Sequence, residues 1–219
     1  MKKVLVVGKN GSIAKDLINY LNERGEFEVV TTSSSDQSNT NTYKLVFDEK
    51  CSIPDELLSY KFDHIIIGAG YEPQSNLFES ELIHIHKMFN IHVIGPMILL
   101  QKLIPNMNDN GSIVLFSSPA AQKGSYDPSY SAVKGAINSL VKTLAKDVGP
   151  KLRVNAISPS LVTDSTVFKR MTEDFRLKHL NNTLTKKNTT TLDCIHAIVY
   201  LMNGNQVTGQ VLQVNGGMI

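Results

Sequence analysis

Short apolar runs alternate with longer segments of helical periodicity along the whole of this 219-residue chain. Residues 4–7 are continuously apolar, and residues 13–21 then carry apolar side chains at the spacing of an amphipathic helix. The alternation recurs, and it predicts strands at 4–7, 27–32, 43–47, 64–67, 112–116, 152–157 and 210–214. Strands separated by helices form a parallel sheet with helices on both faces. The pattern therefore predicts an α/β fold with three layers.

The composition is that of an ordinary globular domain. With 42% hydrophobic residues the chain can bury a full core, so we expect residues 1–219 to form one domain. A net charge of +2 is too small to indicate a nucleic-acid or membrane partner. Cys51 and Cys194 lack the spacing of a disulfide or metal framework, which favours a reduced, cytoplasmic environment and no metal site. Polar residues interrupt the apolar segment 91–103, so no membrane-spanning helix is expected.

Tyr130 and Lys134 lie four residues apart in a segment of helical periodicity, and Ser118 ends an apolar strand shortly before them. Residues i and i+4 share a helix face, so the phenol and the ammonium can point into one cleft. A nearby ammonium lowers the pKa of a phenol, and a serine hydroxyl can stabilise a developing oxyanion. The three residues suit proton transfer in carbonyl/alcohol interconversion. A tyrosine and a lysine with this spacing also occur by chance on ordinary helices, so the surrounding sequence decides whether the pair is functional.

Several turns that follow predicted strands supply that context. Parallel sheets bind ligands outside the carboxyl ends of their strands, where the strand order switches. The turns are at 8–14 (G-K-N-G-S-I-A), 68–70, 117–118 and 159–160. Glycine allows a backbone to approach a phosphate closely, and a helix N-terminus favours the negative charge. The sequence therefore predicts a nucleotide site beside Tyr130.

Together with the segments 153–163 (RVNAISPSLVT) and 208–217 (TGQVLQVNGG), these residues resemble the short-chain dehydrogenase/reductase family over nearly the whole chain. The resemblance implies a Rossmann-type doubly wound parallel sheet of about seven strands in the order 3-2-1-4-5-6-7. It also implies hydride transfer between a nicotinamide cofactor and a small carbonyl or alcohol. In that reaction Tyr130 would be the acid/base and Ser118 would orient the carbonyl. Lys134 would hold the nicotinamide ribose and lower the pKa of Tyr130.

The candidate cofactor-binding residues come from the glycine turn, the strand ends and the resemblance. They are Gly8, Lys9, Asn10, Gly11, Ser12, Ile13, Ser33, Asp48, Gly68, Ala69, Gly70, Tyr130, Lys134, Val162 and Thr163. For Asp48 the resemblance implies a contact with the adenine amino group, and an ordinary turn aspartate is the alternative. Thr163 is expected near the nicotinamide carboxamide, where Thr166 competes for the role.

The chain departs from the family pattern at two places. The glycine motif has Gly11 one position early and Ala14 in place of its last glycine, a spacing that still permits nucleotide binding. His92 stands where the family has an asparagine that holds a water in the proton path to the lysine. Histidine titrates near neutrality, so His92 would make the relay pH-sensitive; as a satisfied core histidine it would leave the relay weaker.

The end of the second predicted strand indicates which cofactor is preferred. An acidic residue there favours NAD, but residues 31–35 offer only hydroxyls, including Ser33, and Asp36 follows too late. Small hydroxyls leave room for a 2′-phosphate, and Lys9 could neutralise it. We therefore expect NADP(H) rather than NAD(H).

Residues 164–187 are rich in charge with a few apolar side chains, which favours a substrate lid. Family members commonly form dimers or tetramers, so a homodimer or homotetramer is expected. The main functional hypothesis is an NADP-dependent oxidoreductase with Tyr130 as acid/base. A non-catalytic nucleotide-binding regulator or scaffold on the same fold is the alternative, and retention of Ser118 and Tyr130 favours the enzyme.

Overall fold

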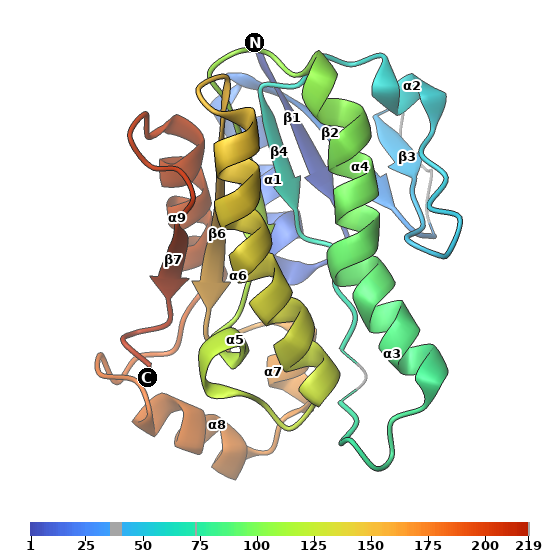
Figure 1. Ribbon diagram of the computed structural model, residues 1–219. Coiled ribbons are helices and arrows are strands. Elements are labelled where there is room, and N and C mark those ends of the chain that lie inside the picture. The colour runs from blue at the N-terminus through green and yellow to red at the C-terminus, as the bar shows by residue number, and fades with distance from the viewer. Residues whose placement is uncertain (36–40, 73, 219) are drawn as a thin grey trace.

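The computed structural model describes residues 1–35, 41–72 and 74–218, and within them seven parallel strands form one sheet (Figure 1). The strand order is β3-β2-β1-β4-β5-β6-β7, which confirms the predicted doubly wound Rossmann topology. The strands are β1 Lys2–Val7, β2 Phe27–Ser33, β3 Thr42–Lys44, β4 His64–Ile67, β5 Gly111–Phe116, β6 Leu152–Pro159 and β7 Val211–Val214. Their arrowheads point to the lower edge in Figure 1, where the short helices α5, α7 and α8 gather.

Helices cover both faces of the sheet and complete the three layers. They are α1 Ser12–Arg24, α2 Asp55–Leu58, α3 Leu82–Phe89, α4 Gly95–Leu103, α5 Ala120–Lys123, α6 Pro128–Val148, α7 Thr166–Arg170, α8 Glu173–Asn181 and α9 Thr191–Asn203. A π-helix, Asn90–Ile94, joins α3 to α4, and a 3-10 turn, Ile104–Asn106, follows α4. Helices α1 and α9 pack on one face, whereas α4 and α6 pack on the other.

Successive residues of each strand contribute to opposite cores, because side chains alternate across a strand. In β1, Val4 and Val6 join the core under α1 and α9, whereas Leu5 and Val7 join the core under α4 and α6. Both faces of the strand are therefore buried, which explains the continuous apolar runs in the sequence. The double burial fixes the register of β1 beside β4 and places the turns that follow both strands side by side.

The π-helix has a local cause in the sequence. Pro96 has no backbone N–H, so the carbonyl of His92 loses its usual helical donor. The wider π turn directly before α4 accommodates this loss, and such turns occur often at functional sites. Gly95 is required beside it, because a Cβ there would lie 2.4 Å from the Phe47 ring. The π-helix carries His92, and it turns this residue into the interior.

The predicted end of the third strand was wrong. The third strand was expected at 43–47, but β3 ends at Lys44. Leu45 and Phe47 are buried in the core although they lie outside the strand, so their apolar character reflects packing rather than sheet pairing. The first long helix after β4 begins at Leu82, and residues 77–79 before it form a turn. The segment 164–187, predicted as a lid, carries the short helices α7 and α8.

Among the described residues, the helical run Leu82–Asn106 is the one segment long and apolar enough to cross a membrane by length and composition, with a mean hydropathy of 1.2. That test is weak evidence, since a core helix of a soluble protein meets it equally. Leu99 and Leu100 of α4 are buried against the sheet. Over the run as a whole, 39% of the apolar window is buried.

Candidate active site

Helix α6 begins at a well-defined cap that orients Tyr130. Asp127 is the N-cap residue, and its Oδ1 accepts a hydrogen bond of 3.1 Å from the Tyr130 backbone N–H. Its Oδ2 accepts a bond of 3.4 Å from the Ser75 N–H, which ties the segment before α3 to the same cap. Asp127 was missed in the sequence, although an aspartate directly before Pro128 is a helix-start signal.

Tyr130 and Lys134 lie on one face of α6, as their spacing predicted. The Lys134 Nζ lies 5.3 Å from the centroid of the Tyr130 ring. It donates a hydrogen bond of 2.8 Å to the Phe116 carbonyl at the end of β5, and it lies 3.4 Å from His92 Nδ1. Lys134 is buried, so these contacts fix its ammonium at the carboxyl edge of the sheet.

The two serines after β5 have different surroundings. Ser117 is buried, and its hydroxyl donates to the Asn138 side chain. Ser118 accepts a hydrogen bond from the Ala120 N–H at the start of α5, and its hydroxyl is near enough to the Tyr130 phenol to act on its pKa. The structure therefore brings Ser118, Tyr130 and Lys134 together.

The environment of Tyr130 raises the pKa of its phenol above the ordinary value. Burial is the main cause, and the negative charge of Glu72 and its hydrogen bond to the phenol add to it, while the hydrogen bond with Ser118 opposes it. The predicted lowering of this pKa was wrong for the protein without a ligand. Burial also lowers the pKa of Lys134 to about 8, although the charge of Glu72 acts in the opposite direction. Glu72 was not identified as a site residue in the sequence.

His92 contacts Lys134 directly. Its Nδ1 faces the Lys134 ammonium, which can only donate, so Nδ1 is the acceptor and Nε2 carries the proton. In this tautomer Nε2 donates to the Tyr71 carbonyl at 3.0 Å, and it also lies 3.2 Å from the Tyr71 backbone nitrogen. Burial and the Lys134 charge lower the pKa of His92 to about 3. The expected titration near neutrality was therefore wrong, because His92 is neutral throughout that range.

The turn between β1 and α1 fits a nucleotide phosphate. Gly8 has φ of +86°, and a Cβ there would lie 2.8 Å from the Ala69 Cα, so the two turns touch through bare backbone. Gly68 donates its N–H to the Val7 carbonyl and joins the same two turns. Gly11 is the N-cap of α1 and makes no side-chain cap, which leaves the first N–H groups of α1 facing outward. A phosphate at this helix N-terminus would find N–H donors and a favourable dipole.

Several other predicted cofactor residues surround this turn. Ser12 and Ile13 form the first turn of α1, and Ile13 packs on the core below. The Cβ position of Gly70 lies 3.7 Å from the His92 ring, so the turn after β4 also borders the lysine site. Predicted residues that follow β1 and β4 thus lie along the same edge of the sheet.

Polar and basic groups meet at the end of β2. The Lys9 backbone N–H donates to the Thr32 carbonyl at 2.9 Å, and Lys9 Nζ lies 3.5 Å from Thr42 Oγ1. Asn10 Nδ2 donates to Ser33 Oγ at 3.2 Å. Asp36, which was considered for cofactor preference, lies outside the described residues. Lys9 and Ser33, two of the predicted cofactor residues, therefore lie at neighbouring positions of this rim.

The turn after β6 is held by Thr189. Val162 forms a parallel bridge with Thr189, and the Thr163 N–H donates to the Thr189 carbonyl at 2.9 Å. Thr166 lies further along as the first residue of α7. Asp48 lies apart and is exposed, and its Oδ1 accepts bonds from the N–H groups of Lys50 and Cys51. The local geometry of Asp48 is that of an ordinary turn aspartate.

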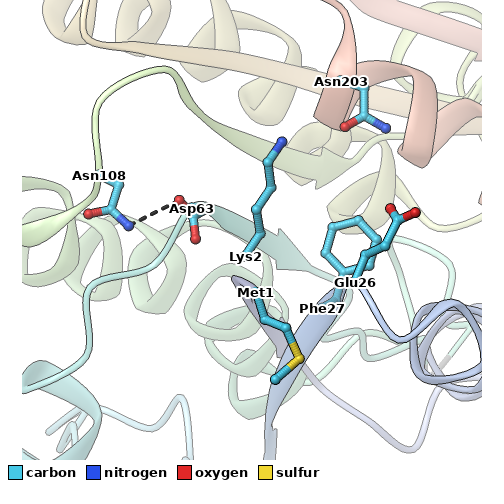
Figure 2. A pocket seen from close by; sticks show the side chains of 7 residues that line it. All are labelled: Met1, Lys2, Glu26, Phe27, Asp63, Asn108 and Asn203. Atoms are coloured by element: carbon cyan, nitrogen blue, oxygen red, sulfur yellow. Dashed lines mark hydrogen bonds between the residues drawn. The ribbon is translucent and has the colours of Figure 1, made fainter.

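A cavity of about 600 Å³ lies at the opposite, amino-terminal edge of the sheet (Figure 2). Its lining residues are Met1, Lys2, Glu26, Phe27, Asp63, Asn108 and Asn203. Asn108 donates to Asp63 there at 3.0 Å, as the dashed line in Figure 2 shows. None of the predicted site residues belongs to this cavity, so its volume does not identify the site.

A parallel sheet of this order, with a phosphate-fitting turn at its switch point, is a Rossmann-type nucleotide-binding fold. A family model described as Enoyl-(Acyl carrier protein) reductase matches residues 53–219. The chain is 26% identical to the uncharacterized oxidoreductase YmfI of Bacillus subtilis over 239 residues, which cover 99% of this chain and 98% of that protein. It is 30% identical to the 3-oxoacyl-(acyl-carrier-protein) reductase of Homo sapiens over 169 residues, which cover 72% of this chain and 67% of that protein.

Solved structures agree with the sequence comparisons on the fold. The crystal structure of a short-chain dehydrogenase/reductase, glucose/ribitol dehydrogenase, from Brucella melitensis matches with a TM-score of 0.87 at 22% identity, covering 100% of this chain and 96% of that one. The chain belongs to the short-chain dehydrogenase/reductase family of oxidoreductases. Members of this family bind a nicotinamide cofactor, either NAD or NADP.

Proposed function

We propose that this protein transfers a hydride between NADP(H) and a small carbonyl or alcohol substrate, with Tyr130 as the acid/base. The observation that carries the proposal is the buried ammonium of Lys134, which lies 5.3 Å from the Tyr130 ring centroid and is held by the Phe116 carbonyl at the end of the strand that Ser118 follows. A nicotinamide cofactor, when bound, supplies or accepts the hydride. A protein that only bound nucleotides would need Lys134 but neither hydroxyl.

Each of the three side chains has a separate task in this proposal. The phenol of Tyr130 is protonated at neutral pH, since burial keeps its pKa above the ordinary value, which is itself above neutrality. It can donate that proton to the oxygen of a carbonyl being reduced. Ser118 donates a second hydrogen bond to the same oxygen as negative charge develops. Phe116 and His92 hold two of the Lys134 donors, and the remaining N–H would be available to bind the nicotinamide ribose.

We expect His92→Asn to leave the pH profile of kcat unchanged between about pH 5.5 and 7.5. The pKa of His92 is lowered to about 3, so the imidazole gains no proton in that window and its replacement removes no titration. The measurement is kcat at saturating substrate for both proteins across this range. An inflection near pH 6.5 that is present in only one of the two kcat profiles would show that His92 titrates during turnover.

The cofactor preference rests on the rim at the end of β2. The small hydroxyl side chains there leave space for the 2′-phosphate of NADP, and Lys9 brings a positive charge close to Thr42, while Asn10 binds Ser33. Fluorescence titration should give a Kd for NADPH at least about tenfold below that for NADH. Lys9→Gln should weaken NADPH binding by about three- to tenfold and leave NADH unchanged, whereas Lys15→Gln, at an exposed position of α1, should change neither. Tighter binding of NADH would overturn the preference.

We also propose that residues 1–219 act as one domain with 164–187 as the substrate lid, in a cytoplasmic homodimer or homotetramer. Val162 and Thr189 bracket the lid, and their bridge gives it a fixed base. Exposed apolar side chains at Leu82, Ile83 and Met97 offer a surface for another copy. Light scattering of the purified protein tests the oligomer, and a monomeric mass would contradict it.

A further inference from the structure

Lys123 ends α5, the short helix that follows Ser118, and its ammonium forms no ion pair within the part of the chain that the structure describes. The Ala121 N–H donates to the Ser118 carbonyl at 3.0 Å. The Lys123 N–H donates to the Pro119 carbonyl at 3.1 Å, so the backbone closes a single tight turn. Lys123 therefore lies one helical turn beyond the serine proposed to bind the reacting oxygen. None of the roles proposed above uses it.

The Lys123 ammonium contacts a thioether. Its Nζ lies 2.8 Å from Sδ of Met218, a side chain that is buried. A thioether is a weak acceptor, whereas an ammonium forms its strongest hydrogen bonds with anionic oxygen. Burial also lowers the pKa of Lys123, so its charge is partly removed from water with no anion to stabilise it. An anion that entered beside Met218 would supply the acceptor that the thioether replaces poorly.

Met218 belongs to a C-terminal segment that is fixed to the proposed lid. The Gly216 carbonyl accepts bonds of 2.8 Å from the Leu184 N–H and 3.1 Å from the Thr185 N–H, and both donors follow α8. Gly216 has φ of +62°, and a Cβ there would lie 2.5 Å from Thr185 Oγ1, so glycine permits this close approach. The Lys123 ammonium is thus linked through Met218 to the base of the lid.

A second polar group without a partner lies at the same end of the lid. His179 is in the last turn of α8, and its Nδ1 is buried with no hydrogen-bond partner among the described residues. The two charges that act on the pKa of His179 come from Lys123 and Lys178, and both are positive. The region between α5 and the end of α8 is therefore electropositive, which suits an anionic group on a ligand.

We propose that Lys123 binds a carboxylate on the substrate, so that the substrates are oxo acids and the corresponding hydroxy acids. The inference rests on the proposed function and specifies its substrate class. The substrate carboxylate displaces the Met218 thioether as acceptor, while the carbonyl of the same molecule lies against Ser118 and Tyr130. Lys123 is a substrate-binding residue in this arrangement and takes no part in the proton transfer.

Matched pairs of an oxo acid and its amide test the inference, because each pair differs by the charge at one end. Suitable pairs are pyruvate with pyruvamide, acetoacetate with acetoacetamide and levulinate with levulinamide, which place the acid at increasing distance from the carbonyl. The measured quantity is the ratio of kcat/KM for acid over amide, with NADPH saturating. We expect at least one pair to favour the acid by about tenfold or more, as a hydrogen bond between charged groups does.

Substitutions at the lysine and its thioether neighbour separate binding from structure, in the pair with the largest ratio. Lys123→Gln should bring the ratio to about one, and Lys123→Arg should keep it within about threefold because the charge is retained. Met218→Leu keeps the apolar volume and removes the competing acceptor, so the ratio should stay or rise. Lys142→Gln is the matched control, since Lys142 is an exposed lysine in the later part of α6, and it should keep the wild-type ratio.

A wild-type ratio at or below one in all three pairs, or a ratio that Lys123→Gln leaves unchanged, would overturn the role of Lys123 and leave the proposed oxidoreductase standing. A fall to about one in Met218→Leu would also overturn it, because the contact between lysine and thioether would then be structural. Absence of turnover with every member of the pairs, and with a wider carbonyl panel, would overturn both proposals.

Discussion

Tyr130→Phe should lower kcat for carbonyl reduction by about 10²- to 10⁴-fold, the range that a positioned general acid contributes. The substitution removes one oxygen atom and keeps the ring that packs beside His92, with a centroid separation of 6.1 Å. The fold and the phosphate turn should be unaffected. The expected result is therefore a large loss of kcat with a cofactor Kd within about threefold of the wild type, measured by fluorescence titration.

Tyr126→Phe is the control for Tyr130→Phe. Tyr126 is exposed, and its hydroxyl accepts a hydrogen bond from Asn76 on the neighbouring loop rather than from a site residue. It should keep kcat within about twofold of the wild type, as surface changes usually do. Equal activity of Tyr130→Phe and wild type would remove Tyr130 from the chemistry, whatever the control shows.

Gly8→Ala should have the second large effect, because it places a Cβ where two backbone turns touch. The new atom would lie 2.8 Å from the Ala69 Cα and 2.9 Å from its nitrogen, and φ at this position is +86°. Overpacking and the left-handed backbone together should cost about 2 to 4 kcal/mol of unfolding free energy. The turns after β1 and β4 must also separate, so the cofactor affinity should fall at least about tenfold.

Substitutions at two further glycines separate the backbone cost of Gly8→Ala from its effect on cofactor binding. Gly25 has φ of +66° with nothing within 4 Å of a Cβ, so Gly25→Ala carries only the backbone cost, about 1 to 2 kcal/mol, and should keep cofactor affinity. Gly11 has φ of −65° and only ordinary contacts around a Cβ, so Gly11→Ala should fold normally. Its Cβ stands at the N-terminus of α1 and should still weaken cofactor binding at least about tenfold. Wild-type affinity in both Gly8→Ala and Gly11→Ala would contradict a phosphate site at this turn.

The fold was predictable from the sequence because its main determinants are local. Val4 to Val7 is apolar on both faces, which is required of a strand buried between two helix layers, and the same holds for the other central strands. The spacing of Tyr130 and Lys134 likewise fixes their common face on α6 without any tertiary information. These features follow from periodicity alone.

The missed features depend on contacts between segments far apart in the chain. The charge of Glu72 acts on the pKa of Tyr130, although the two residues are far apart in the chain and no local pattern marks their approach. The environment of His92 depends on burial by the π-helix and on the approach of Lys134. The early end of β3 depends on Phe47 packing over Gly95. Burial and nearby charge set the directions of the pKa shifts of Tyr130 and His92, which the residue types alone predicted wrongly.

Transfer of a labelled hydride is the most direct test of the proposed oxidoreductase. Wild-type protein would be incubated with NADPH that carries deuterium at the transferable position and with a panel of small carbonyls, and the products would be examined by mass spectrometry. We expect an alcohol with deuterium on the carbinol carbon, formed in equal amount to the NADP produced and absent with Tyr130→Phe. Cofactor binding without any labelled alcohol from the panel would contradict the oxidoreductase and favour a nucleotide-binding regulator.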